Sequence, residues 1–256
     1  MVGFIRHLSQ RLRRLADKLE YRDVREAKRL GVSVPLYRSV ARIQAREPIK
    51  AVIDVGANSG AWAQMISRLL PNAAIHCFEP VPSCLAQLAD LKQRLPQLSV
   101  YPCALGARRE SAIMNVNHFS PSSSLLEMSS RHRELWPETD GSTPIPIAVS
   151  TLDHELSEFH GPALLKLDVQ GYELPVLQGG YRILRSCHLV ISEVLFEDLY
   201  LNQTRVGALI EFMHDQGFRI GEVLGQHRTD SSQFLAYADL VFVPRRKPEA
   251  LETGLR

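Results

Sequence analysis

The sequence has few cysteines and no long apolar run, and both absences narrow the class of protein. Its four cysteines among 256 residues form no CxxC pair, so we expect reduced core residues. The nine histidines show no HExxH motif or other ligand spacing, which leaves no sequence case for a metal site. No apolar run reaches about eighteen residues, and the N-terminus lacks the apolar core and cleavage site of a signal peptide. These features predict a cytoplasmic protein without a transmembrane segment.

Charge is nearly balanced overall but uneven along the chain. The net charge is +2, with 45% hydrophobic and 23% charged residues, which is ordinary for a globular protein. Residues 1–46 carry 12 Lys and Arg against 4 Asp and Glu, whereas the rest of the chain carries 18 against 24. The larger part is therefore acidic and has no basic stripe with interleaved aromatics, which argues against a nucleic-acid substrate.

The first thirty residues have the pattern of an amphipathic basic helix that ends near Gly31. Its apolar positions are Ile5, Leu8, Leu12, Leu15 and Leu19. Three interpretations stay open: an arm that packs on its own domain or on a partner subunit of a homo-oligomer, peripheral attachment to an anionic membrane, and a solvated charged helix. A second short helix is expected at 36–46. We set this basic extension at residues 1–47.

Residues 51–60 predict a strand, a tight turn and the start of a helix. Residues 51–55 are apolar and β-branched, which is typical of a strand buried on both faces of a parallel sheet. Gly56 and Gly60 bracket the turn, and a helical pattern begins at residue 61. Such a turn brings bare backbone close to a ligand at a helix N-terminus.

The next strand-like run, 74–78, is followed by Glu79, which lies 23 positions after Gly56. An acid at this place accepts hydrogen bonds from a ribose diol. A dinucleotide fingerprint would have glycine where Asn58 stands, and Asp54 would repel a pyrophosphate. The pattern D-x-G-x-N-x-G with a distal acid is instead similar to the S-adenosylmethionine site of class I methyltransferases.

Strands and helices alternate through the rest of the chain, which is typical of a parallel sheet with right-handed crossovers. We expect one domain over residues 48–244 and a tail over 245–256. The expected strands are 98–103, 111–117, 145–149, 163–167, 188–191, 218–224 and 240–243.

Residues 118–147 interrupt this alternation. The segment is rich in serine, proline and charge and has weak periodicity, which predicts a lid or binding loop. The serines at 122–124 either donate hydrogen bonds to an acceptor or cap a helix that begins at Leu125. His118 and His132 are expected to be solvated loop residues unless they touch substrate.

Asp168 follows the apolar run 163–167. Ligands of open α/β sheets bind beyond the carboxyl ends of the strands, where the strand order reverses. Because the fourth main strand is expected beside the first, Asp168 should face the same cleft as the Gly56 turn. Capping of the following helix is the alternative. Glu193 is a second acid, expected at the carboxyl edge of the strand over 188–191.

The ordered motifs together resemble the FkbM family of S-adenosylmethionine-dependent methyltransferases over roughly residues 50–243. They are DVGANSG at 54–60, FEP at 78–80, ALG at 104–106, SSSL at 122–125, TLD at 151–153, KLDVQGYELPVLQG at 166–179 and SEV at 192–194. The resemblance implies the class I methyltransferase fold, an α/β Rossmann-like architecture with a seven-stranded, mostly parallel sheet, an antiparallel last strand and helices on both faces. It also implies methyl transfer, usually to a hydroxyl oxygen of a sugar, glycolipid or other natural product, so the partner would be a small-molecule or glycan acceptor.

The resemblance also assigns residues to an S-adenosylmethionine site. Asp54, Gly56 and Gly60 would shape the methionine side, Glu79 would hold the ribose, and Ala104 would lie near adenine. Asn58 and Pro80 belong to the same motifs. Asp168 is the leading hypothesis for a general base that removes the acceptor proton. The candidate acceptor contacts are His118, Ser123, Ser124 and Glu193.

Three alternatives stay open. The chain could be a binding or scaffold protein that kept the fold and lost transfer, or a nicotinamide-dependent oxidoreductase, since that class shares the strand, glycine turn and distal acid. Asp168 with a nearby carboxylate could instead hold a divalent ion, although the sequence gives no ligand set for one.

Overall fold

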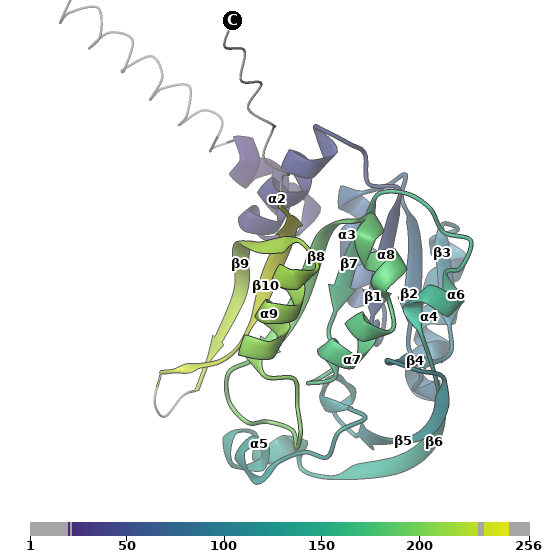
Figure 1. Ribbon diagram of the computed structural model, residues 1–256, viewed down its shortest axis with the longest axis vertical. Helices are drawn as coiled ribbons and strands as arrows, with labels where there is room; N and C mark the ends of the chain where they lie inside the picture. Colours follow the sequence, from purple (N-terminus) through teal and green to yellow (C-terminus); the bar gives the residue numbers. More distant parts are fainter. Residues whose placement is uncertain (1–19, 21, 230–232, 246–256) are drawn as a thin grey trace, which may run out of the picture.

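A twisted sheet of buried strands runs through the centre of the molecule (Figure 1). The computed structural model describes residue 20, residues 22–229 and residues 233–245. Within these residues, seven strands form the sheet in the order β3-β2-β1-β7-β8-β10-β9. Their bounds are β1 (Ala51–Val55), β2 (Ala74–Phe78), β3 (Leu98–Tyr101), β7 (Ala163–Leu167), β8 (Cys187–Leu195), β9 (Phe218–Arg228) and β10 (Leu235–Pro244).

The sheet confirms the predicted fold class. Strand β1 pairs in parallel with β2 and β7, and β7 pairs in parallel with β8. The last strand, β10, is antiparallel to both β8 and β9. All five residues of β1 and all five of β7 are buried, because helices cover both faces of the sheet.

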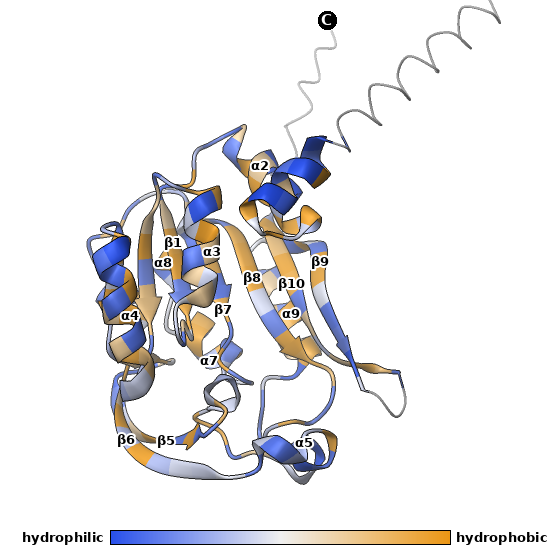
Figure 2. Cartoon of the chain, turned by 180° about the vertical axis from the view of Figure 1, so that it is seen from behind, coloured by the Kyte–Doolittle hydropathy of each residue, from blue (hydrophilic) through white to orange (hydrophobic). Residues whose placement is uncertain are grey.

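Two helical layers enclose the sheet. The core on one face is built with α2 (Val34–Gln44), α3 (Ala61–Leu69) and α4 (Pro82–Arg94). The core on the other face is built with α6 (Leu152–Glu155), α7 (Glu173–Gln178), α8 (Tyr181–Ser186) and α9 (Val206–Asp215). Figure 2 shows the apolar strands between helices whose outer faces are hydrophilic.

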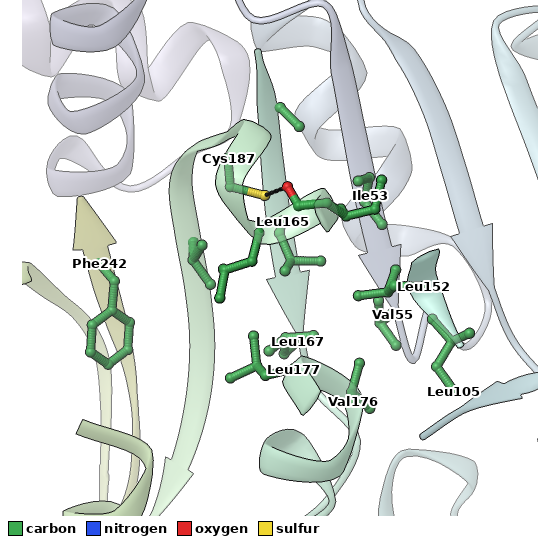
Figure 3. Packing of buried hydrophobic residues seen from close by; sticks show 14 of the residues in the cluster. Ile53, Val55, Leu105, Leu152, Leu165, Leu167, Val176, Leu177, Cys187 and Phe242 are labelled. Atoms are coloured by element: carbon green, nitrogen blue, oxygen red, sulfur yellow. Dashed lines mark hydrogen bonds between the residues drawn. The ribbon is translucent and has the colours of Figure 1, made fainter. Parts of the chain in front are cut away.

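The second of these cores packs α7 and α8 onto the central strands. Val176 and Leu177 of α7 lie against Leu165 and Leu167 of β7 (Figure 3). The Sγ of Cys187 donates a hydrogen bond of 3.3 Å to the carbonyl of Ile183 in α8. All four cysteines are free and buried, as the sequence predicts.

A small second sheet lies beyond the carboxyl ends of β1, β2 and β7 (Figure 1). Its order is β4-β6-β5, with bounds β4 (Ala104–Leu105), β5 (Glu110–Asn117) and β6 (Ser142–Ser150). The segment between β5 and β6 contains η1 (Ser120–Ser122), α5 (Ser130–Leu135) and η2 (Pro137–Thr139). The expectation of a lid or binding loop over 118–147 stays a prediction, but its bounds change: residues 142–147 pair with β5, and residues before them pack on the end of the main sheet.

Several strand boundaries differ from the sequence predictions, and β6, β9 and β10 are all longer than the expected strands 145–149, 218–224 and 240–243. The expected strand 98–103 ends earlier, at Tyr101, as β3, and the two-residue β4 that follows it belongs to the small sheet. Strand β8 continues to Leu195, because β10 supplies antiparallel partners for residues 190–195. Glu193 therefore lies inside a strand rather than just after one.

The N-terminal expectations are tested only in part, because residues 1–19 lie outside the described residues. Residues 22–30 are helical, and Gly31 ends this helix with a φ of +72°. Helix α2 follows, with the Ser33 side chain accepting a hydrogen bond from the amide of Leu36. The proposed tail beyond Arg245 also lies outside the described residues. Among the described residues, no helix combines the length and apolar character needed to cross a membrane.

Candidate functional site

A cavity opens where the carboxyl ends of β1, β2 and β7 meet the small sheet, and we call it the glycine-turn cavity. Eight of the residues predicted for the cofactor or the acceptor line it. They are Gly56, Asn58, Glu79, Pro80, Ala104, Ser123, Ser124 and Asp168. Segments far apart in the sequence thus converge on one hollow, as the parallel topology predicts.

The turn after β1 approaches the turn after β7 so closely that position 56 has no room for a side chain. Gly56 has a φ of +77°, and a Cβ there would stand 1.9 Å from the carbonyl oxygen of Asp168. The amide of Asp168 in turn donates to the carbonyl of Val55 at 3.1 Å. Gly60 has a different role, because a Cβ there would collide with Leu88 and Leu91 of α4.

Glu79 closes one side of the cavity and is 4% exposed. Its Oε2 accepts from the amide of Asn58 and its Oε1 from the amide of Val81, both at 2.8 Å. Burial raises the pKa of Glu79, and these two hydrogen bonds oppose that shift. Because a carboxylate has about four lone-pair sites, Glu79 keeps acceptor capacity for a ligand hydroxyl.

Lys166 connects the cavity to the sheet interior. Its Nζ lies 3.3 Å from Asp54 Oδ1 and 3.2 Å from Asp168 Oδ2. It also donates to the carbonyl of Gly56 at 3.4 Å. Burial lowers the pKa of Lys166, but the Asp168 and Asp54 carboxylates outweigh that effect and raise it above its usual range. The lysine is therefore charged, and it holds the glycine turn and Asp168 together.

Asp54 is fully buried. Burial raises its pKa, and the ion pair with Lys166 opposes that shift. Neither of its oxygens has a hydrogen-bond partner of good geometry in the part of the chain that the structure describes. Its charge thus depends on Lys166, and its role toward a cofactor stays a prediction.

Gln170 orients Asp168. Its Nε2 donates to Asp168 Oδ1 at 2.8 Å and approaches Glu193 Oε1 at 3.4 Å. Its Oε1 accepts from the Tyr200 hydroxyl at 3.0 Å, and its backbone carbonyl accepts from Ser124 Oγ at 2.9 Å. Gln170 has a φ of +53°, a strained conformation for a residue other than glycine, and such strain is typical of functional turns.

A second cavity adjoins the first, and we call it the α5 cavity. The two share Pro121, Asp168 and Gln170. With its side chain 37% exposed, Asp168 is accessible at this junction. The geometry supports the expectation that Asp168 faces the same cleft as Gly56. The alternative was that Asp168 caps the following helix. The acid found at the start of α7 is instead Glu173, which accepts a hydrogen bond from the amide of Gly171 at 3.0 Å.

The remaining candidates lie apart from the glycine-turn cavity. Glu193 lines the α5 cavity. His118 is exposed, and its Nε2 lies 2.9 Å from the carbonyl of Glu138. The expectation that His132 is solvated is wrong, because it is 4% exposed and packs between Trp136 and Tyr200. Burial lowers its pKa.

The serines do not cap a helix at Leu125, because α5 begins at Ser130 and is capped by Ser129. Ser123 Oγ accepts from the amide of Asn117 at 3.0 Å. Ser124 Oγ accepts from the amide of Leu126 and donates to Gln170, so both serines hold the wall of the cavity in place.

Lys166, Gln170 and Tyr200 are site residues that the sequence reasoning missed. A signal for Lys166 was present: a lysine inside an otherwise apolar buried strand needs an acid, and Asp54 is the acid in the neighbouring apolar strand. No local pattern marks Tyr200, whose partners lie 30 and 78 positions away.

The comparisons with known proteins agree with this geometry. The family model described as Methyltransferase FkbM domain matches residues 54–220. The 2-O-methyltransferase NoeI of Sinorhizobium fredii is 24% identical over 221 residues, which are 82% of this chain and 86% of the relative. The hexuronic acid methyltransferase AglP of Haloferax volcanii is 31% identical over 141 residues, 55% and 54% of the two chains.

The crystal structure of Methyltransferase FkbM from Methylobacillus flagellatus is 15% identical, with a TM-score of 0.48. That similarity covers 75% of this chain and 44% of the other.

The first prediction concerns the buried ion pair. The substitution Lys166→Met leaves Asp54 buried without a counter-charge, so we expect the free energy of unfolding to fall by about 3–5 kcal/mol. Adding Asp54→Asn removes the orphaned charge and should restore part of this loss. Urea denaturation of the wild type, both single variants and the double variant measures the coupling. Additive effects of the two substitutions would contradict the pairing.

The second prediction concerns Glu173. Burial raises its pKa from 4.5 to about 7, with Asp168 adding to the shift and backbone hydrogen bonds opposing it. The folded state therefore binds more protons than the unfolded state between these pH values, and stability should fall as the pH rises through this window. In Glu173→Gln this contribution is absent. The difference in unfolding free energy between wild type and variant should change with pH from 4.5 to 7; a constant difference would contradict the assignment.

Proposed function

The chain belongs to the FkbM methyltransferase family, and from this premise we propose that it transfers the methyl group of S-adenosylmethionine to a hydroxyl oxygen of a sugar or related natural product. The observation that carries the proposal is the position of Asp168 at the junction of two cavities. A base at this junction reaches both the donor and the acceptor of a methyl group.

The charge of the glycine-turn cavity supports S-adenosylmethionine as the cofactor. The charged residues among those lining it are Glu79 and Asp168, both acidic. A sulfonium and an ammonium group suit such a wall, whereas a dinucleotide pyrophosphate would meet repulsion. This argues against the nicotinamide-dependent alternative.

The shape of the lining also fits an adenosine. Phe78, Leu105 and Met114 give the cavity apolar surface for a purine, beside Ala104. Glu79 has free acceptor sites for the ribose hydroxyls. Bound there, the cofactor supplies an activated methyl group on a sulfonium.

Asp168 would act as the general base. An alcohol oxygen attacks well only if its proton leaves as the new bond forms, and Asp168 is the accessible carboxylate beside that position. Lys166 holds Oδ2 and Gln170 holds Oδ1, so the carboxylate is fixed before the acceptor arrives. Alignment of the acceptor oxygen with the methyl group and exclusion of water supply the rest of the rate enhancement.

The relatives support oxygen and sugar as the acceptor type. One is named as a 2-O-methyltransferase and another as a hexuronic acid methyltransferase. A scaffold protein that had lost transfer is the competing proposal. It gains no support from the site, because the acid, its lysine and its glutamine are all in contact.

The third prediction tests the cofactor site. The substitution Glu79→Gln replaces a carboxylate oxygen with a donor, so we expect at least about tenfold weaker binding of S-adenosylmethionine and of its demethylated product. Calorimetric titration measures both constants. Glu211→Gln, an exposed acid on α9, is the matched control and should bind as the wild type does. Unchanged binding in Glu79→Gln would refute the ribose assignment.

The fourth prediction tests the base. Asp168→Asn keeps the shape of the side chain but cannot take a proton, so we expect turnover to fall by about 10²–10⁴-fold. Affinity for S-adenosylmethionine should fall far less than turnover, because Glu79 keeps its charge and its acceptor sites in the same cavity. Formation of the demethylated product, followed by chromatography with an accepted hydroxylated substrate, measures turnover. Near-wild-type turnover in this variant would exclude Asp168 as the base.

A further inference from the structure

The α5 cavity has the size and position of an acceptor site. Its volume is about 470 Å³, and residues of η1, α5, η2, β8, β9 and β10 line it. It meets the glycine-turn cavity at Asp168 and Gln170, so a molecule bound there presents an atom to the proposed base. Binding pockets for small molecules typically have volumes of about 300–1,000 Å³.

Aromatic rings form part of the wall of the α5 cavity. His227 stacks on Tyr237 with a centroid distance of 4.2 Å and an interplanar angle of 13°. Trp136 lies 6.2 Å from Tyr237, and His132 lies 5.3 Å from Trp136. These rings hold one another in place and give the cavity rigid apolar surface, which suits the C–H face of a sugar ring.

Carboxyl groups line the same cavity beside these rings, since Asp239 is two residues from Tyr237 on β10 and shares its face of the strand. Glu193 and Asp239 are directly opposite each other in the β8–β10 register, and Asp168 and Glu138 also line the cavity. Carboxylate oxygens accept hydrogen bonds from hydroxyl groups. Aromatic rings with hydrogen-bond acceptors beside them match a sugar ring that is apolar on its face and hydroxylated at its edge.

The same carboxyl groups make the cavity resist further negative charge. Burial raises the pKa of Glu193, and then Asp168 and Asp239 raise it further. The pKa of Asp239 is also raised, first by burial and then by Asp168. Lys166 and His227 act in the opposite direction and lower it. Among the residues lining this cavity there is no lysine or arginine in the part of the chain described, so an acceptor carboxylate would find no strong cationic partner.

We propose that the α5 cavity binds the methyl acceptor and selects an uncharged hydroxylated sugar ring over a sugar that carries a carboxylate. This inference rests on the proposed function and adds the chemical class of the acceptor. It separates this chain from the relative whose name gives hexuronic acid as its acceptor. Glu193 and Asp239 would determine this specificity, and Trp136 would contribute affinity for the ring of either sugar.

Matched pairs of glycosides test the selection. Saturation-transfer NMR titrations would use the full chain with S-adenosylhomocysteine and three pairs of methyl glycosides: glucoside and glucuronide, galactoside and galacturonide, mannoside and mannuronide. We expect at least one neutral glycoside to bind and its uronide to bind at least about tenfold more weakly, because burial and crowded carboxyl groups already disfavour negative charge in this cavity. Equal or tighter binding of the uronides, or no binding of any neutral glycoside, overturns the proposal.

Two variants identify the cause of the selection. In Glu193→Gln/Asp239→Asn the repulsion is reduced, so the preference for the neutral glycoside should fall to within about threefold. In Trp136→Ala both members of a pair should lose binding, while the preference itself persists. Glu211→Gln is the control and should behave as the wild type does. A preference that is unchanged in the double variant contradicts the role of these carboxyl groups.

The same preparation separates this inference from the proposed function. Calorimetric binding of S-adenosylhomocysteine and methyl transfer to any hydroxylated acceptor report on the proposed function. Cofactor binding and transfer without the neutral preference would overturn this inference alone. Absence of cofactor binding would overturn the proposed function, whichever sugar binds.

Discussion

The candidate site depends on the charge of one buried lysine, Lys166, which contacts Asp54, Asp168 and the carbonyl of Gly56. Lys166 stands directly opposite Asp54 in the pairing of β7 with β1, and Asp168 follows two residues later on the same side of the chain. The charges of Lys166 and Asp54 are costly to bury, so each depends on the other, and the more accessible Asp168 gives the lysine a second carboxylate. Because Lys166 also donates to the carbonyl of Gly56, the glycine turn and Asp168 are held by the same side chain.

Close backbone contact reinforces this coupling. The turn after β1 and the turn after β7 touch at Gly56 and Asp168, where a Cβ on Gly56 would meet the Asp168 carbonyl at 1.9 Å. Gln170 extends this network of contacts toward the surface. Its side chain hydrogen-bonds both Asp168 and Tyr200, and its backbone carbonyl accepts a hydrogen bond from Ser124. A chain of contacts thus runs from the sheet interior to the segment that covers both cavities. Preorganisation of this kind is what methyl transfer requires, because the reacting atoms must be aligned before the bond forms.

Local signals explain which parts could be predicted from the sequence. The strand, glycine turn and helix over 51–69 follow from an unbroken apolar run, two glycines and a helical period, and Glu79 and Asp168 follow from acids placed just after buried strands. The covering segment could not be predicted, because its structure depends on distant partners. His132 is buried only because α5 packs on β8, and Glu193 is inside a strand only because β10 pairs there. Polar composition indicates that a segment does not form the hydrophobic core, but it does not show which part of the molecule that segment packs against.

Under the proposed function, the distribution of charge would suit one cavity to the methyl donor and the other to the acceptor. Acids line both, and the lysine that balances them is turned inward, where it contacts Asp54 and Asp168 and lies over the ring of Trp62. Such a wall is favourable for a cationic sulfonium donor in the glycine-turn cavity. In the α5 cavity the same sign of charge is compatible with hydroxyl groups and disfavours a carboxylate. Under the proposed function the donor would lose its sulfonium charge on methyl transfer and with it part of this attraction, so the wall that favours binding of the donor would also favour release of the product.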